Sequence, residues 1–232
     1  MNEQQKQILQ KLKDETNGEE RVKLYWAFQE TKPDGAAWAQ YHDVLAPTYE
    51  KDLELTNYNS PSGLFDAVKQ RFSGGNKDIR ILDVGAGTGH CGQQLSEMGF
   101  TNIDALDSSQ GMLDEAAKRN VYKHFYCELI TTDPLKVVPS AAYDVVVSSG
   151  TFFPTLLDGS HLPACLGTVK EGGHLVISGA PYDDKDLNVR PVLKKMVESG
   201  EVEIVEDKKI EKWFEDSEHT VHGFMLILKR LK

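Results

Sequence analysis

The chain has 232 residues, 40% of them hydrophobic, which is enough for one globular domain of ordinary size with an appended segment. Its formal net charge of −10 repels phosphate backbones and argues against a nucleic-acid partner. Three widely spaced cysteines form neither a disulfide framework nor a zinc motif, and together with a polar N-terminus and no long apolar run they indicate a cytoplasmic protein outside the membrane.

The first 60 residues predict a helical cap that precedes the main domain. Residues 3–16 predict a polar helix with a thin apolar stripe, which we expect to be exposed or frayed. Weaker helical patterns follow at residues 19–30 and 34–54, and Pro47 interrupts the second of them. A further helix, which begins near Pro61, opens the domain that we assign to residues 61–232.

Beyond residue 78, short apolar runs alternate with helical patterns. The predicted strands cover residues 79–84, 102–107, 124–130, 143–149 and 174–179, and the predicted helices cover residues 90–98, 109–119, 161–170 and 190–199. This alternation is typical of an α/β fold with a doubly wound parallel sheet. The tail predicts two more strands, at 201–210 and 222–231, which can pair antiparallel at the sheet edge.

The stretch "ILDVGAGTGHCG", residues 81–92, stands where the first strand meets a helix. Glycines there let backbone approach a ligand at the helix N-terminus. Dinucleotides and S-adenosylmethionine both bind at this place in doubly wound sheets. A dinucleotide turn needs G-x-G-x-x-G, whereas the third glycine here comes one residue early, and the preceding Asp83 suits a cationic ligand better than a pyrophosphate.

The second strand ends in "ALDSSQGML", and its last residue is Asp107. A carboxylate at this point can accept hydrogen bonds from both hydroxyls of a ribose. The glycines together with this acid and the strand–helix alternation predict a nucleoside-containing ligand.

The segments "LDVGAGTG" and "ALDSSQGMLDEA" resemble the first two motifs of the class I S-adenosylmethionine-dependent methyltransferases. The resemblance covers residues 79–232 and implies a Rossmann-like sheet of seven strands, mostly parallel, with an antiparallel last strand. Three further segments, "YHDVLAPTYEKDLELTNYNSPSGLFDAV", "YDVVVSSGTF" and "VKEGGHLVIS", resemble a narrower group, the methyltransferase-like proteins related to the one encoded in the Williams–Beuren syndrome region.

The resemblance implies a set of cofactor-binding residues. Gly85, Ala86, Gly87 and Gly89 would line the methionine and ribose, Asp83 would order that loop or face the amino group, and Asp107 would hold the ribose. Ser108, Met112, Leu129 and Ile130 would contact the adenine, Ser148 and its neighbour Ser149 would lie near the methyl group, and Tyr49 would close over the cofactor. Many relatives carry an acid beside the adenine amino group, and neither Glu128 nor Asp133 aligns with it.

The implied function is methyl transfer from S-adenosylmethionine, with S-adenosylhomocysteine as product, to a small molecule or a protein side chain. We expect no metal and assign no catalytic residue, since no base motif is present. His42 and His161 are candidate bases, although a lone histidine is more often structural, and Cys165 is expected in the core rather than as a nucleophile. We expect a monomer or a weak homodimer.

Two other functions stay open at this point. One is a non-catalytic module that binds the cofactor without transferring a methyl group, and the other is a nicotinamide-dependent oxidoreductase. The helical region at residues 34–60, rich in aromatic residues such as Trp38, Tyr41 and Tyr58, predicts a mobile lid over the cofactor. The alternative is a fixed helix docked on the sheet.

Overall fold

The computed structural model describes residues 1–232 except 57–61, 73–74, 76, 182–186 and 216–219. The described residues form a seven-stranded sheet in the order β3-β2-β1-β4-β5-β7-β6. The strands are β1 (Ile81–Val84), β2 (Ile103–Asp107), β3 (Phe125–Cys127), β4 (Tyr143–Phe152), β5 (Val169–Gly179), β6 (Val202–Glu215) and β7 (Thr220–Arg230). The first five are mutually parallel and β7 is antiparallel to β5, which confirms the predicted doubly wound α/β fold.

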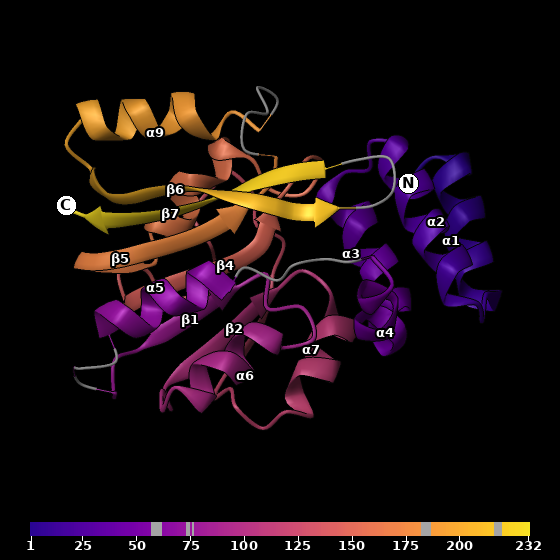
Figure 1. The fold of residues 1–232 in the computed structure, drawn as a ribbon, viewed down its shortest axis with the longest axis horizontal. Helices are drawn as coiled ribbons and strands as arrows, with labels where there is room; N and C mark the ends of the chain where they lie inside the picture. Colours follow the sequence, from indigo (N-terminus) through magenta and orange to yellow (C-terminus); the bar gives the residue numbers. More distant parts are fainter. Residues whose placement is uncertain (57–61, 73–74, 76, 182–186, 216–219) are drawn as a thin grey trace.

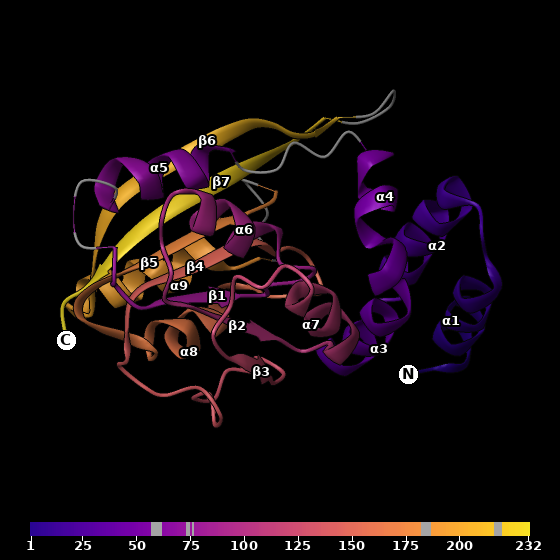
Figure 2. The same cartoon turned by 90° about the horizontal axis from the view of Figure 1, so that it is seen from below.

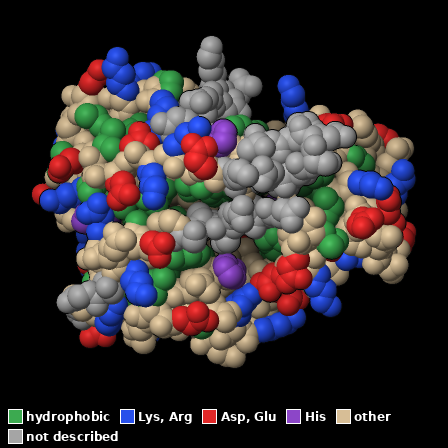
Figure 3. Space-filling view, in the orientation of Figure 1, with side chains coloured by type: hydrophobic (Ala, Val, Ile, Leu, Met, Phe, Trp, Pro, Cys, Tyr) green, Lys and Arg blue, Asp and Glu red, His purple; other side chains and the backbone are tan. Residues whose placement is uncertain are grey.

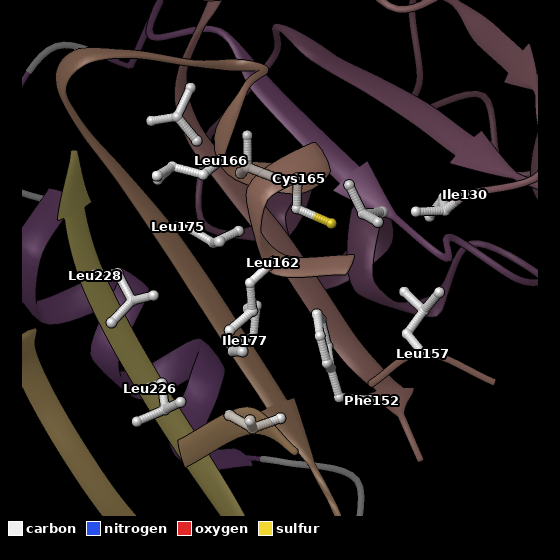
Figure 4. Packing of buried hydrophobic residues seen from close by; sticks show 14 of the residues in the cluster. Ile130, Phe152, Leu157, Leu162, Cys165, Leu166, Leu175, Ile177, Leu226 and Leu228 are labelled. Atoms are coloured by element: carbon white, nitrogen blue, oxygen red, sulfur yellow. The ribbon is translucent and has the colours of Figure 1, made fainter. Parts of the chain in front are cut away.

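Helices cover both faces of this sheet. Neighbouring residues of each strand point to opposite sides, so each face carries apolar side chains that the helices bury. On one face Ile81, Ile103 and Val145 pack against α5 (Ser62–Phe72), α6 (His90–Glu97) and α7 (Gln110–Ala117). On the other face Leu82 and Leu175 pack against α8 (Leu162–Leu166) and α9 (Val189–Glu198). Figure 4 shows this second layer, in which Cys165 lies among Leu162, Leu166 and Leu175.

Several predicted elements have other bounds in the structure. The third strand ends at Cys127 rather than residue 130, and the chain beyond it turns into a loop that reaches the sheet's carboxyl edge. The helix predicted at residues 161–170 ends at Leu166, and β5 begins at Val169 rather than residue 174. The strands β4 and β6 extend to Phe152 and Glu215, beyond the predicted residues 149 and 210. The Arg230 guanidinium donates to the carbonyl oxygens of Leu166 and Val169, at 3.2 and 2.5 Å, and so ties the end of α8 to β7.

The N-terminal helices gather beyond the carboxyl ends of the parallel strands (Figures 1 and 2). They are α1 (Glu3–Asp14), α2 (Gly18–Glu30), α3 (Gly35–Leu45), a 3₁₀ turn η1 (Ala46–Thr48) that contains Pro47, and α4 (Tyr49–Glu54). A second 3₁₀ turn, η2 (Gly159–His161), precedes α8. Pro47 thus breaks the helical run as predicted.

The cap has its own aromatic core. Phe28, Trp38 and Tyr41 are fully buried, with the rings of Phe28 and Tyr41 stacked at 4.5 Å. The expectation that α1 is exposed or frayed is wrong: Ile8 and Leu12 are buried in this core, and a capping box between Asn2 and Gln5 fixes the helix start.

The predicted boundary at residue 60, Pro61 and Tyr58 lie outside the described residues, so the division into residues 1–60 and 61–232 stays a prediction. No described helix is both long and apolar enough to cross a bilayer.

Candidate functional site

The glycine loop opens at the carboxyl end of β1, next to β4, where the strand order reverses direction. Gly85, Gly87 and Gly89 have positive φ angles of 71°, 53° and 88°, which explains why glycine occupies all three positions. A Cβ on Gly85 would lie 2.2 Å from Thr151 Oγ1, whereas a Cβ on Gly87 would meet no protein atom within 4 Å. The backbone at Gly87 therefore faces open space and can approach a ligand.

Asp107 joins this loop to the end of β2. Its Oδ2 accepts a hydrogen bond from Gly87 N at 2.8 Å, and its Oδ1 accepts one from Ser109 N at 2.9 Å. Burial raises the pKa of Asp107 above its usual range, and the backbone N–H groups of Ser109 and Gly87 oppose that shift. The carboxylate thus holds the loop while it also lines the neighbouring cavity.

Asp83 lies under the loop rather than in it. The side chain is fully buried, and Tyr122 donates its hydroxyl to Asp83 Oδ2 at 2.7 Å. The same hydroxyl accepts a hydrogen bond from Gly92 N in α6, at 3.1 Å. Burial raises the pKa of Asp83 to about 6, although the Tyr122 hydroxyl acts in the opposite direction. Of the two roles expected for Asp83, the geometry favours ordering of the loop and α6 over contact with a ligand.

A cavity of about 940 Å³ lies over the loop. Eight of the residues predicted to bind a cofactor line it: Tyr49, Gly85, Gly87, Asp107, Ser108, Met112, Leu129 and Ile130. Four do not belong to the lining: Asp83, Ala86, Gly89 and Ser148. Gly89 caps α6 and Ser148 is fully buried, while Ser149, which points to the opposite side of β4, reaches the cavity.

At the end of the cavity beyond β3, neither of the two acids considered for the adenine amino group belongs to the lining. Glu128 accepts hydrogen bonds from the backbone N–H groups of Lys136 and Val137, at 2.7 and 3.0 Å, and so stabilises its own loop. Asp133 is exposed and is not part of the lining. Thr131 and Thr132 line this end, and the sequence alone gave no reason to single them out.

The cap forms the opposite wall. His42 stacks on Trp38 at 5.3 Å, and burial lowers the pKa of His42 to about 4, so this ring is neutral at neutral pH. Burial also raises the pKa of Tyr49 to about 12. Trp38 Nε1 donates to Thr155 Oγ1 at 3.0 Å, which connects the cap to the segment after β4.

Two carboxylates that sequence reasoning missed hold the cap against the main domain. Asp43 Oδ1 accepts hydrogen bonds from Ser109 Oγ at 2.6 Å and from Gly111 N, at the start of α7, at 2.9 Å. Glu50 accepts a hydrogen bond from Thr88 Oγ1 at 2.7 Å and pairs with Arg119. No local pattern marks these acids, because their partners are distant in sequence.

The other candidates occupy different surroundings. His161 lines the cavity, and its Nδ1 lies 2.9 Å from Asp158 Oδ1 in the turn that starts η2. Cys165 is fully buried, and burial raises its pKa to about 12, which confirms its place in the core.

Comparisons with known proteins find similarity to methyltransferases. A family model described as "Methyltransferase domain" matches residues 81–173. The chain is 29% identical to human Methyltransferase-like protein 27 over 141 residues, which are 61% of this chain and 57% of the relative. It is 37% identical to the Malonyl-[acyl-carrier protein] O-methyltransferase of Bacillus anthracis over 113 residues, 47% of this chain and 40% of that one. The chain thus spans about half the length of these curated relatives.

Solved structures share the fold at low identity. The [4+2]-cyclase SpnF matches with a TM-score of 0.66 at 14% identity, over 86% of this chain and 97% of that chain. The magnesium protoporphyrin IX methyltransferase of Synechocystis PCC 6803, solved with bound SAM, matches with a TM-score of 0.50 at 17% identity, over 72% and 78%. Residues 81–173 are thus similar to a methyltransferase domain, and the chain shares its fold with solved methyltransferases.

Proposed function

We propose that this chain binds S-adenosylmethionine in the cavity over the glycine loop and transfers its methyl group to a small molecule or a protein side chain. The observation that carries the proposal is the pairing of Gly87, whose missing Cβ leaves open space, with the Asp107 carboxylate that lines the same cavity. The residues present therefore fit a cofactor that combines a ribose with a cationic group.

Each wall of the cavity has a role in this proposal. The backbone of Gly85 and Gly87 would hold the methionine portion, and Asp107 would accept hydrogen bonds from the ribose hydroxyls. The adenine would lie among Ser108, Met112, Leu129 and Ile130, while Tyr49 and Ser149 would border the methyl group.

The sulfonium of S-adenosylmethionine supplies an already activated methyl group, so the protein has to align the acceptor and exclude water. The cap suits the second task because Trp38, His42 and Tyr49 close one wall with rings that carry no charge at neutral pH. Asp43 and Glu50 hold this wall in place.

A non-catalytic, cofactor-binding module remains the alternative. SpnF, named as a [4+2]-cyclase, shares the fold, so the fold alone does not distinguish a methyltransferase from a protein with another role. The nicotinamide alternative has less support, because Gly89 serves as the N-cap of α6 and leaves the loop one residue too short for the dinucleotide turn.

Methyl transfer is tested with S-adenosylmethionine labelled in its methyl group, incubated with the protein and with metabolite or protein fractions. We expect label in an acceptor and S-adenosylhomocysteine in equal amount. Cofactor binding with no labelled product in any fraction would support the module instead. Tight binding of NAD, detected by its absorbance after gel filtration, together with no binding of S-adenosylmethionine, would overturn both.

A further inference from the structure

The cavity extends well beyond the predicted cofactor residues. Apart from Tyr49 in α4, those residues follow β1, β2 and β3, whereas most of the other lining residues come from α2, α3, α4, the end of β4 and the segment after it. The volume of about 940 Å³ lies at the upper end of the range of about 300–1,000 Å³ for ligand pockets, and a large part of the lining lies outside the predicted cofactor residues. We call the part over β4 the outer half, lined by Tyr25, Trp26, Trp38, Phe153, Leu156 and Leu157.

The apolar residues of the outer half come from two distant parts of the chain that contact each other. Trp38 donates a hydrogen bond to Thr155, and Leu156 packs against the aromatic core of the cap. Tyr25 and Trp38 lie ring against ring at 5.3 Å. A ligand here would contact aromatic and aliphatic side chains on both sides, which favours burial of apolar surface.

The charged residues that line the cavity disfavour the binding of an anionic ligand. Among the described lining residues Arg21 is the only Lys or Arg, and both oxygens of Asp52 already bind its guanidinium, at 2.7 and 2.6 Å. Glu30 and Asp107 add negative charge without a lysine or arginine beside them in the described lining. Figure 3 shows acidic and basic side chains interspersed on the face of the molecule that it presents.

We propose that the outer half binds the methyl acceptor and selects an uncharged, mainly apolar small molecule. This rests on the proposed function, because the cofactor must occupy the other half. It goes beyond that function by excluding anionic acceptors and protein side chains as the preferred class.

Two fluorescent probes with the same rings test the proposal. N-phenyl-1-naphthylamine is uncharged, and 8-anilinonaphthalene-1-sulfonate adds a sulfonate. Both are titrated into the full chain with saturating S-adenosylhomocysteine. We expect the uncharged probe to bind at least tenfold more tightly and not to be displaced by S-adenosylhomocysteine. Equal or tighter binding of the sulfonate, or displacement of the uncharged probe, would overturn the proposal.

The location is tested with Leu156→Lys, which places a cation in the outer half. We expect at least a fivefold loss for the uncharged probe and a gain for the sulfonate. Val197→Lys in α9, an exposed apolar residue far from the lining, is the matched control and should change neither. Identical behaviour of the two variants would refute the assignment. If Leu156→Lys does not fold, Trp26→Lys, at a position 36% exposed, gives the same test.

The two proposals fail in different ways. Calorimetry that detects no binding of S-adenosylhomocysteine refutes the proposed function, whereas titration of both probes without it still measures the charge preference of the outer half. If S-adenosylhomocysteine binds and displaces the uncharged probe, the proposed function is still supported. Only the proposal of a separate acceptor site is then refuted.

Discussion

Asp107 combines a structural and a binding role in one carboxylate. It already accepts hydrogen bonds from Gly87 N and Ser109 N, and its place in the cavity leaves it available to a ribose. Hydrogen bonds to a charged group contribute about 1.5–3 kcal/mol each. We therefore expect Asp107→Ala to weaken S-adenosylmethionine binding at least tenfold in calorimetry and also to lower the melting temperature.

The exposed carboxylate Asp114, on α7, provides the control. Asp114→Ala should leave the dissociation constant within twofold of the unaltered protein. An Asp107→Ala variant that folds and binds the cofactor with unchanged affinity would contradict the ribose assignment.

Asp83 predicts a pH dependence of stability. Its pKa is about 6 in the folded protein and about 3.9 in an unfolded chain, so the folded state binds the proton more tightly between these values. The contribution of Asp83 to the free energy of unfolding therefore falls as pH rises from about 4 to about 6. Two pKa units correspond to on the order of 3 kcal/mol.

Denaturant unfolding of the unaltered chain and of Asp83→Asn at several pH values measures this effect. The amide does not titrate, so the difference between the two free energies should change with pH below about 6 and be flat above it. A difference that stays constant between pH 4 and pH 7 would show that Asp83 keeps an ordinary pKa.

At the scale of elements, α3 and α4 are docked on the main domain both by apolar packing, such as that of Leu156 on the cap core, and by a few hydrogen bonds and ion pairs. Asp43 binds the start of α7, and Glu50 binds Thr88 and Arg119 beside the glycine loop. We expect S-adenosylmethionine to slow hydrogen exchange in residues 35–54 while exchange in the central strands stays the same, because the ligand bridges the cap and the loop.

Asp43→Ala should speed exchange in the same helices, and Asp14→Ala, at the exposed end of α1, should not. If exchange across residues 35–54 is the same with and without cofactor, the cap is a static part of the fold and the lid prediction is wrong.

The sequence predicts secondary-structure elements better than it predicts tertiary contacts. Apolar runs such as "VVVSS" identify the central strands, since burial on both faces leaves few polar residues there. The edge strands β3 and β6 are predicted too, with other bounds, although β3 is largely exposed and β6 is rich in charged residues. Side-chain direction is harder to predict: Ser148 and Ser149 are equivalent in the sequence, and only the register of β4 shows that Ser149 reaches the cavity. The docking of Asp43 and Glu50 depends on tertiary packing and left no local signal.

At the scale of the whole molecule, the cavity lies between two separate cores. One is the aromatic core of the cap, and the other consists of the two layers that pack against the sheet. A ligand that contacts both sides should therefore stabilise the assembled protein. The central claim of this account is that the ligand is S-adenosylmethionine and that it lies against the backbone of Gly87.

Calorimetry on Gly87→Val and Gly172→Val, with a chelator present at neutral pH, tests this claim most directly. Both glycines have positive φ, 53° and 77°, and a Cβ on either would meet no protein atom within 4 Å, so the two substitutions impose similar backbone strain. Only Gly87 lines the cavity. We predict one S-adenosylmethionine site in the unaltered chain and in Gly172→Val, and no binding in Gly87→Val. Unchanged affinity in a folded Gly87→Val variant, or no binding by the unaltered chain at millimolar S-adenosylmethionine, would contradict the account.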